Sequence, residues 1–127
     1  AKIFRGIEFN KKVKHNIINM WITVNEKYSY NDLHDHPRSV LSGVYYIKHD
    51  GTREQGVITF KHPNRYIQLD YWDQSLLARD NEFNSLYVDF VPEPNKLLIF
   101  PSWLEHRVEQ NLKDDTRISL SFNSNLK

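Results

Sequence analysis

Two separated histidine motifs place the strongest constraint on how this 127-residue chain can fold. The first is HDHP at residues 34–37, and the second is PSWLEH at residues 101–106. Residues at i and i+2 of an extended segment project to the same face, so His34 and His36 can bind one metal ion together. A strand that returns His106 to the same point would add a third imidazole and leave the opposite coordination positions open.

The composition narrows the classes of protein that fit. The chain has no cysteine, which excludes disulfides, thiolate ligands and nucleophilic thiols. Lys and Arg number 17 against 16 Asp and Glu, so a net charge of +1 gives no overall field that favours nucleic acid or a membrane surface. No apolar stretch approaches the roughly 18 residues of a transmembrane helix, and the N-terminus lacks the apolar run of a signal peptide. We therefore expect one soluble, cytoplasmic domain over residues 1–127 that recognises any partner through local features.

Alternating and β-branched stretches predict a mainly β fold. Residues 72–85 are compatible with either a short helix or a loop over the site. Seven or eight short strands with little helix are typical of an antiparallel sandwich or jelly roll, whose interior can hold a metal ion and a small ligand. The predicted strands are residues 17–24, 41–47, 56–60, 66–70, 86–90, a buried strand at 96–100, and 117–122.

The last predicted strand carries polar residues on the face where a sandwich normally has its core. In RISLSF (residues 117–122), Arg117 and Ser119 share one face and the apolar residues share the other. An inward arginine is costly unless an anion pairs with it, and the neighbouring predicted strands offer no evident acidic partner. A carboxylate ligand would supply that charge, held bidentately by the guanidinium and by the hydroxyls of Ser119 and Tyr46. The alternatives are an exposed strand-end charge for Arg117 and ordinary core packing for Tyr46.

Taken as a set, the motifs resemble the Fe(II)/2-oxoglutarate-dependent oxygenases. The set comprises His34-x-His36-Pro37, SGVYYI at 42–47, GVITF at 56–60, LLIFPSWLEH at 97–106 and RIS at 117–119, and the resemblance runs from residue 17 to residue 123. It is closest to the prolyl-hydroxylase-like branch and its small members from phages and marine bacteria. The resemblance implies a double-stranded β-helix, a jelly roll related to the cupins.

The same resemblance implies a set of functional residues and an activity. It implies that His34 and His106 hold Fe(II), and that Arg117, Ser119 and Tyr46 hold the far carboxylate of 2-oxoglutarate. The implied reaction is a dioxygenase reaction that releases succinate and CO2 and hydroxylates a substrate, with a peptidyl proline as the analogy from the family. A phage-encoded enzyme would act in the host cytoplasm.

His36 departs from the pattern of the resembled family, which usually has a carboxylate at this position. Three interpretations remain open. A facial site of three histidines keeps the spacing and suits Fe(II), and this is the interpretation we prefer. Alternatively, Asp32 or Asp35 supplies the carboxylate, although Asp35 would point to the opposite face of an extended segment. Finally, the site could be degenerate and bind another metal, such as Zn or Ni.

Two rival functions also remain. A cupin-type dioxygenase can use three histidines without 2-oxoglutarate, but the glutamate expected shortly after His-x-His is replaced by Val40 and Leu41, and Arg117 would lose its role. A non-catalytic jelly-roll binding module, in which the histidines are incidental, belongs to a different class. Failure to bind any divalent metal would favour that module.

Aromatic residues suggest where a substrate would make contact. Phe100 and Trp103 are candidates for the cavity wall, with ordinary core packing as the alternative. The loops at 25–33 and 71–85 carry Tyr28, Tyr30, Tyr71 and Trp72, and substrate contacts are expected there.

Overall fold

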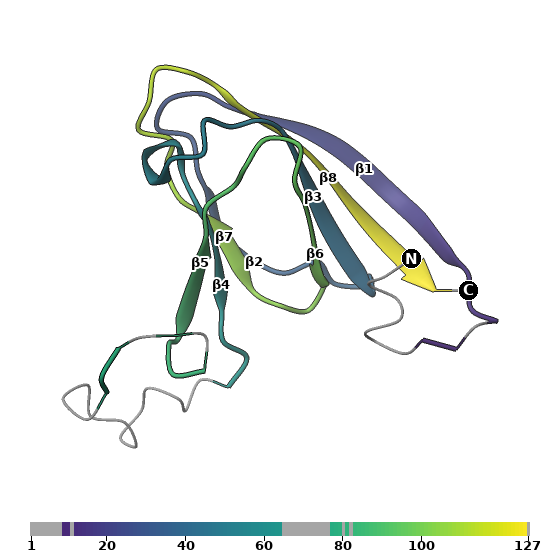
Figure 1. The fold of residues 1–127 in the computed structure, drawn as a ribbon. Coiled ribbons are helices and arrows are strands. Elements are labelled where there is room, and N and C mark those ends of the chain that lie inside the picture. Colours follow the sequence, from purple (N-terminus) through teal and green to yellow (C-terminus); the bar gives the residue numbers. More distant parts are fainter. Residues whose placement is uncertain (1–8, 11, 65–76, 80, 82, 127) are drawn as a thin grey trace.

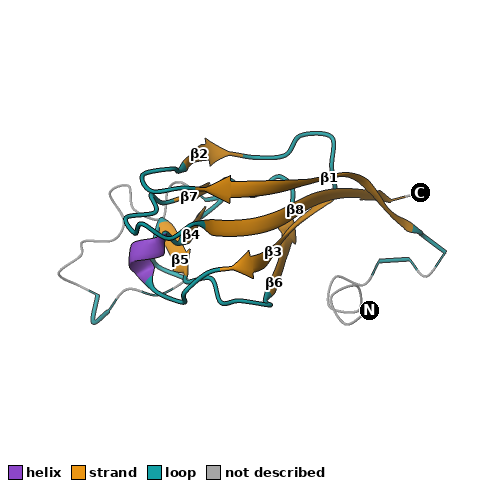
Figure 2. Cartoon of the chain, turned by 90° about the horizontal axis from the view of Figure 1, so that it is seen from above, coloured by secondary structure: helices purple, strands orange, loops and turns teal. Residues whose placement is uncertain are grey.

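The computed structural model describes residues 9–10, 12–64, 77–79, 81 and 83–126. Within these residues the chain is built almost wholly of strands, and its helical structure is the single 3-10 turn η1 at Arg53–Gln55 (Figure 2). The strands are β1 His15–Asn25, β2 Asn31–His34, β3 Leu41–Lys48, β4 Ile58–Lys61, β5 Tyr87–Phe90, β6 Leu97–Pro101, β7 His106–Val108 and β8 Arg117–Leu126.

The strands form two four-stranded sheets with the orders β1-β8-β3-β6 and β2-β7-β4-β5. All of the pairings are antiparallel, and Figure 1 shows the sheets as two layers. Neighbouring strands within each sheet come from distant parts of the sequence, so β1 pairs with β8 and β2 pairs with β7. The predicted mainly β jelly roll, or double-stranded β-helix, is therefore confirmed.

The strand register decides which side chains enter the space between the sheets. Directly opposed residues of an antiparallel pair point to the same face. Ser119 on β8 opposes Thr23 on β1 and Tyr46 on β3, while Arg117 opposes Asn25. The predicted alternation of Arg117 and Ser119 against an apolar outer face is confirmed, and β1 adds polar residues to the same inner surface.

The apolar core lies between the two sheets, and its buried members also line the cavity between them. It consists of Val44, Tyr46, Ile58 and Phe100, with Phe60, Leu98, Leu104 and Val108 packed against them. The Phe60 ring meets the rings of Phe90 and Phe100 edge to face, with centroids 5.6 and 4.9 Å away. Aromatic packing thus fills the half around β4, β5 and β6 and leaves the polar residues of β1 and β8 to line a cavity.

Several predicted elements differ in detail from the observed ones. Strand 96–100 was expected to be buried, but β6 lies at the edge of its sheet, and Leu97 is 48% exposed while Phe100 points inward. The strand expected from residue 56 begins at Ile58, because η1 and a positive φ of 91° at Gly56 precede it. The predicted strand 66–70 lies outside the described residues, and so do residues 72–76, 80 and 82 of the segment 72–85.

The two short strands that carry His34 and His106, β2 and β7, were not predicted. β2 has four residues and β7 has three, and each carries more polar than apolar side chains. Such segments give no clear alternation signal, so their strand character depends on pairing with each other and with β4. Across the residues that the structure describes, no helix is long and apolar enough to cross a membrane.

Candidate active site

One cavity between the two sheets contains every site residue expected from the sequence. They come from five separate segments of the chain and gather where β1 and β8 face β2 and β7. The six residues are His34, His36, Tyr46, His106, Arg117 and Ser119.

The three histidines form a compact cluster at one end of this cavity. His34 ends β2, His36 lies in the loop that follows, and His106 begins β7 directly opposite His34. Each residue offers one ligand atom, and these atoms all lie within 4.8 Å of one another. The Nε2 atoms of His36 and His106 are 3.3 Å apart. This geometry allows three imidazoles to bind one ion from one side.

Backbone carbonyl groups orient two of the imidazoles. The Nδ1 atom of His34 lies 2.6 Å from the Asp32 carbonyl oxygen, and Nδ1 of His106 lies 2.9 Å from that of Leu104. A carbonyl accepts a hydrogen bond, so each Nδ1 carries the proton and each Nε2 keeps a free lone pair. Contacts of this kind fix the tautomer and the ring orientation that metal binding requires.

His36 is oriented by side chains of the β1-β8-β3-β6 sheet. Its Nδ1 atom lies 3.5 Å from the side-chain amide of Asn123, whose oxygen accepts a hydrogen bond from Ser42 at 2.7 Å. When His36 presents Nε2 to a metal, its Nδ1 carries the proton and needs an acceptor. A half-turn of the Asn123 amide presents Oδ1 to that N–H and leaves Nδ2 to donate to the Ser42 hydroxyl. Ser42 and Ser102, which are buried and 2.8 Å apart, extend this network.

Burial lowers the pKa of His36 and His106, which favours the neutral imidazole that metal binding requires. Burial is the main cause that lowers the pKa of His106 to about 4, and the neighbouring His34 and His36 lower it further. Burial, followed by the nearby His34, also lowers the pKa of His36 from its ordinary value. Proton competition at these two nitrogens is therefore weak near neutral pH.

Neither aspartate of the first motif joins the described metal-ligand cluster. Asp35 is exposed, as expected for a residue that alternates with His34 and His36, and Asp32 contributes a backbone carbonyl rather than its carboxylate. The geometry therefore favours the interpretation with three histidines.

Arg117 occupies the other end of the cavity and is only 1% exposed. Its Nη1 atom donates to the carbonyl oxygens of Gln55 at 2.9 Å and Glu109 at 3.4 Å. Its Nη2 atom is buried without a hydrogen-bond partner, and within the described part of the chain no carboxylate pairs with the guanidinium. A buried cation in this state is costly unless an anion binds it.

Two hydroxyl groups lie in the same cavity as the arginine. Tyr46 and Ser119 are buried and occupy opposed positions on β3 and β8. Burial raises the pKa of the Tyr46 phenol well above its ordinary value, although the nearby Arg117 acts in the opposite direction. The phenol therefore stays protonated and can donate a hydrogen bond to an anion.

Sequence reasoning missed the contribution of β1 to the cavity. Trp21, Thr23 and Asn25 line it, with Asn31 from β2. The Trp21 ring lies 5.8 Å from that of His36, centroid to centroid. Alternation along residues 21–25 was the available signal, but only the pairing with β8 shows which face turns inward.

The aromatic residues proposed for substrate contact fall into three groups. Phe100 lines the cavity as predicted, whereas Trp103 is 61% exposed and lies outside it. Tyr28 and Tyr30 are exposed and do not line the cavity, so these two candidates have no contact with the histidine cluster. Tyr71 and Trp72 lie outside the described residues.

Fold and site together define a jelly-roll protein with a facial histidine cluster and a buried arginine whose Nη2 has no hydrogen-bond partner. The model of the family described as "Putative 2OG-Fe(II) oxygenase" matches residues 19–123. This chain belongs to the 2OG-Fe(II) oxygenase family. A search of curated protein sequences gave no match.

Solved structures share the fold at low sequence identity. A 2OG-Fe(II) oxygenase family protein from Burkholderia pseudomallei is 18% identical, with a TM-score of 0.65 over 96% of this chain and 50% of its own. HygX from Streptomyces hygroscopicus, solved with nickel and 2-oxoglutarate, is 10% identical, with a TM-score of 0.65 over 97% of this chain and 62% of its own. The epimerase SnoN from nogalamycin biosynthesis is 16% identical, with a TM-score of 0.64 over 87% and 47%. The chain thus spans 47–62% of the length of these proteins.

The cavity fits the cofactor and co-substrate of the family, Fe(II) and 2-oxoglutarate. Three imidazole nitrogens are a suitable donor set for iron. At the opposite end, the orphaned Nη2 of Arg117 is a suitable partner for a carboxylate group.

Proposed function

We propose that this chain is a dioxygenase that uses Fe(II) and 2-oxoglutarate to oxidise a small-molecule or peptide substrate. The observation that carries the proposal is the buried, unpartnered Nη2 of Arg117 in the same cavity as three clustered imidazoles. Either feature alone has an ordinary structural explanation. Together they match the two ends of a co-substrate that binds a metal at one end and carries a free carboxylate at the other.

In this proposal His34, His36 and His106 hold the iron from one side. The Nδ1 contacts of His34 and His106 with backbone carbonyls keep their Nε2 atoms available. When bound, iron and 2-oxoglutarate supply the activation of dioxygen, with succinate and CO2 as co-products. The chain contributes an open coordination face, because its ligands all approach from the same side.

Arg117 holds the far carboxylate of 2-oxoglutarate through Nη2. Because Nη1 already donates to two carbonyl oxygens, the carboxylate cannot take the fork formed by both terminal nitrogens. The hydroxyls of Tyr46 and Ser119 supply the further donors that the second carboxylate oxygen needs. Charge neutralisation and hydrogen bonding thus fix the orientation of the co-substrate before the substrate reacts.

The identity of the substrate and the type of oxidation are separate proposals, in addition to the use of Fe(II) and 2-oxoglutarate. Hydroxylation, with a peptidyl proline as the family analogy, is the outcome that we propose first. Structural neighbours named as an epimerase and a carbocyclase show that this fold supports other outcomes. The prolyl-hydroxylase-like branch, the phage origin, the cytoplasmic location and the single domain over residues 1–127 also stay predictions.

Calorimetric titration tests the proposal. Anaerobic Fe(II)-loaded protein is titrated with 2-oxoglutarate beside the variants Arg117→Ala and His36→Ala. We expect binding by the wild-type protein, loss of 2-oxoglutarate binding in Arg117→Ala, and weaker iron binding in His36→Ala. Iron binding with no response to 2-oxoglutarate would favour the cupin-type alternative, and failure to bind any divalent metal would favour a non-catalytic module.

A further inference from the structure

We infer that Gly56 is a positioning residue for Arg117: its missing side chain lets Nη1 of the guanidinium dock on backbone carbonyls and leaves Nη2 for a ligand carboxylate. This inference rests on the proposed function, since the ligand is 2-oxoglutarate. It assigns a role to the loop between β3 and β4, which contributes no residue to the histidine cluster.

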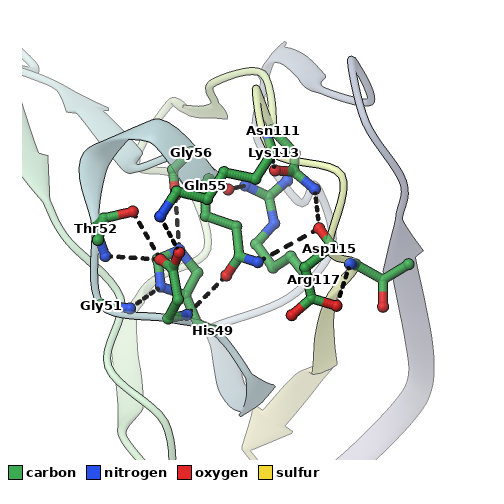
Figure 3. Close-up of polar contacts among 11 residues, drawn as sticks. His49, Gly51, Thr52, Gln55, Gly56, Asn111, Lys113, Asp115 and Arg117 are labelled. Carbon is green, nitrogen blue, oxygen red and sulfur yellow. Dashed lines mark hydrogen bonds and ion pairs between the residues drawn. The ribbon is translucent and has the colours of Figure 1, made fainter.

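The guanidinium sits in a cradle made of backbone atoms, drawn in Figure 3. Nη1 of Arg117 donates to the carbonyl oxygens of Gln55 and Glu109, which belong to two different loops. The Glu109 amide in turn donates to the Val57 carbonyl at 2.9 Å and ties the two loops together. Carbonyl groups neutralise no charge, so the cradle fixes the position of the cation without satisfying its need for an anion.

Gly56 is the point where a side chain would destroy this cradle. A Cβ atom there would overlap Nη1 of Arg117 and would lie only 2.5 Å from the Glu109 carbonyl oxygen. The backbone also has φ +91°, which side chains other than glycine rarely accept. Glycine is therefore required both by the turn and by the close approach of the guanidinium.

Buried side chains hold the glycine in place. The His49 imidazole is 4% exposed, its Nε2–H donates to the Gly56 carbonyl at 3.0 Å, and its Nδ1 accepts from the Gly51 amide at 3.0 Å. The Gln55 side chain is fully buried, and its oxygen accepts from the Asp50 amide at 2.7 Å. Figure 3 shows the Gln55 side chain between His49 and Arg117, with its amide donating to the Asp115 carbonyl at 3.4 Å. The loop is thus a rigid support and not a mobile connection.

Gly56→Ala tests the inference, with Gly51→Ala as the matched control. Both glycines have positive φ and lie in the same loop, but a Cβ at Gly51 meets no atom within 4 Å. With the holo protein, we expect Gly56→Ala to weaken 2-oxoglutarate binding by about 10- to 100-fold, because misplacement of a binding group by about 1 Å costs up to about 100-fold. Ni(II) binding to the histidines should be unchanged. Gly51→Ala carries only the backbone strain of a positive φ, so it should lose less thermal stability and keep its affinity for 2-oxoglutarate.

A double-mutant cycle with Arg117→Lys shows whether the effect passes through the guanidinium. Lysine has no atom at the Nη1 position, so adding Gly56→Ala to Arg117→Lys should cost little further affinity. An equal loss from Gly56→Ala in the arginine and lysine backgrounds would overturn the inference, and so would an equal loss from Gly51→Ala.

If Gly56→Ala does not fold, a pair of variants at His49 tests whether the position of Gly56 affects the binding of 2-oxoglutarate. His49→Gln keeps a donor near the Nε2 position for the Gly56 carbonyl, whereas His49→Asn loses it. We expect weaker 2-oxoglutarate binding in His49→Asn than in His49→Gln, and equal binding would overturn the inference. Wild-type protein that binds Ni(II) or Fe(II) but no 2-oxoglutarate would instead refute the proposed function, so the two failures are distinguishable.

Discussion

The histidine end and the arginine end of the cavity are built in opposite ways. The histidines stand at the ends of short strands and in a loop, and His34 and His36 keep partial contact with solvent. Arg117 belongs to the ten-residue strand β8, carries a full charge and is 1% exposed. One end offers several lone pairs to a cation, and the other offers one immobilised cation to an anion.

The two ends therefore differ in the free-energy cost of remaining without a ligand. Neutral imidazoles can be buried at modest cost when their other nitrogen is hydrogen-bonded, as it is in His34 and His106. A buried guanidinium without a counter-ion is much more costly. The histidine end can therefore remain without a ligand at modest cost, whereas an empty arginine end costs more and favours a carboxylate or a similar anion.

The largest effect is expected from His106→Ala, which removes the most buried of the three ligands. Metal affinity should fall by more than the roughly 10- to 100-fold that loss of an outer-shell partner costs. Titration with Ni(II) measures the loss, and His62→Ala, outside the cavity, is the control. Retention of wild-type Ni(II) affinity by His106→Ala would break the assignment of the histidine end.

Arg117→Met should weaken the binding of 2-oxoglutarate at the arginine end without affecting the binding of metal at the histidine end. Methionine keeps the apolar stem but not the charge, and hydrogen bonds to charged groups contribute roughly 1.5–3 kcal/mol. We expect 2-oxoglutarate affinity to fall by about 10- to 150-fold, while Ni(II) affinity stays unchanged. The result would contradict the comparison if metal binding fell together with 2-oxoglutarate binding.

Acid should destabilise the metal-free protein through the histidine end. The pKa of His106 is about 4 in the folded protein, mainly because of burial, and about 6.5 in an unfolded chain. Between these values the unfolded chain binds a proton that the folded chain does not, so stability is fully present above about pH 6.5 and is lost as pH falls toward about 4. Urea denaturation at several pH values measures the loss, and His106→Gln should show a smaller pH dependence than the wild type.

A smaller effect is expected from Asn123→Ala, which removes the side chain next to His36 Nδ1. Loss of an outer-shell partner of this kind costs roughly 10-fold or more in metal affinity. Ser124→Ala is the matched control, because Ser124 is also buried on β8 but donates to the Leu41 carbonyl instead. Equal Ni(II) affinities of the two variants would show that Asn123 does not orient His36.

The smallest effect concerns Trp21, which lies against His36 without a hydrogen bond to it. Trp21→Phe keeps an aromatic wall, so metal affinity should change by less than the roughly 10-fold expected for an outer-shell hydrogen bond. The variant should lose part of the fluorescence quenching that Ni(II) causes in the wild-type protein. Unaltered quenching would place the metal away from Trp21 and from the histidine cluster.

Much of the fold and both ends of the site could be predicted from local patterns. The spacing of His34 and His36 and the alternation of Arg117 and Ser119 are properties of single segments, and each segment has the face that its pattern predicts. The polar inner face of β8 predicted an anion partner, because a buried arginine without one is costly. The structure leaves Nη2 of Arg117 unpartnered in agreement with that argument.

The remaining features depend on contacts between distant segments. Trp21 and Asn25 line the cavity because β1 pairs with β8 in one particular register, and Trp103 points outward although it lies in the same motif as His106. Gly56 appeared in the sequence only as part of a strand pattern, and its role depends on a guanidinium from the other end of the chain.

Local sequence patterns therefore specify which chemical groups are present and which of them share a face of a strand. Side-chain alternation is a local property of an extended backbone. Which of these groups come into contact depends on the tertiary fold, because strand pairing and register are set by packing across the whole domain. That packing places the histidine cluster and Arg117 at different ends of one cavity. It also brings Gly56, in the loop between β3 and β4, against the guanidinium of Arg117.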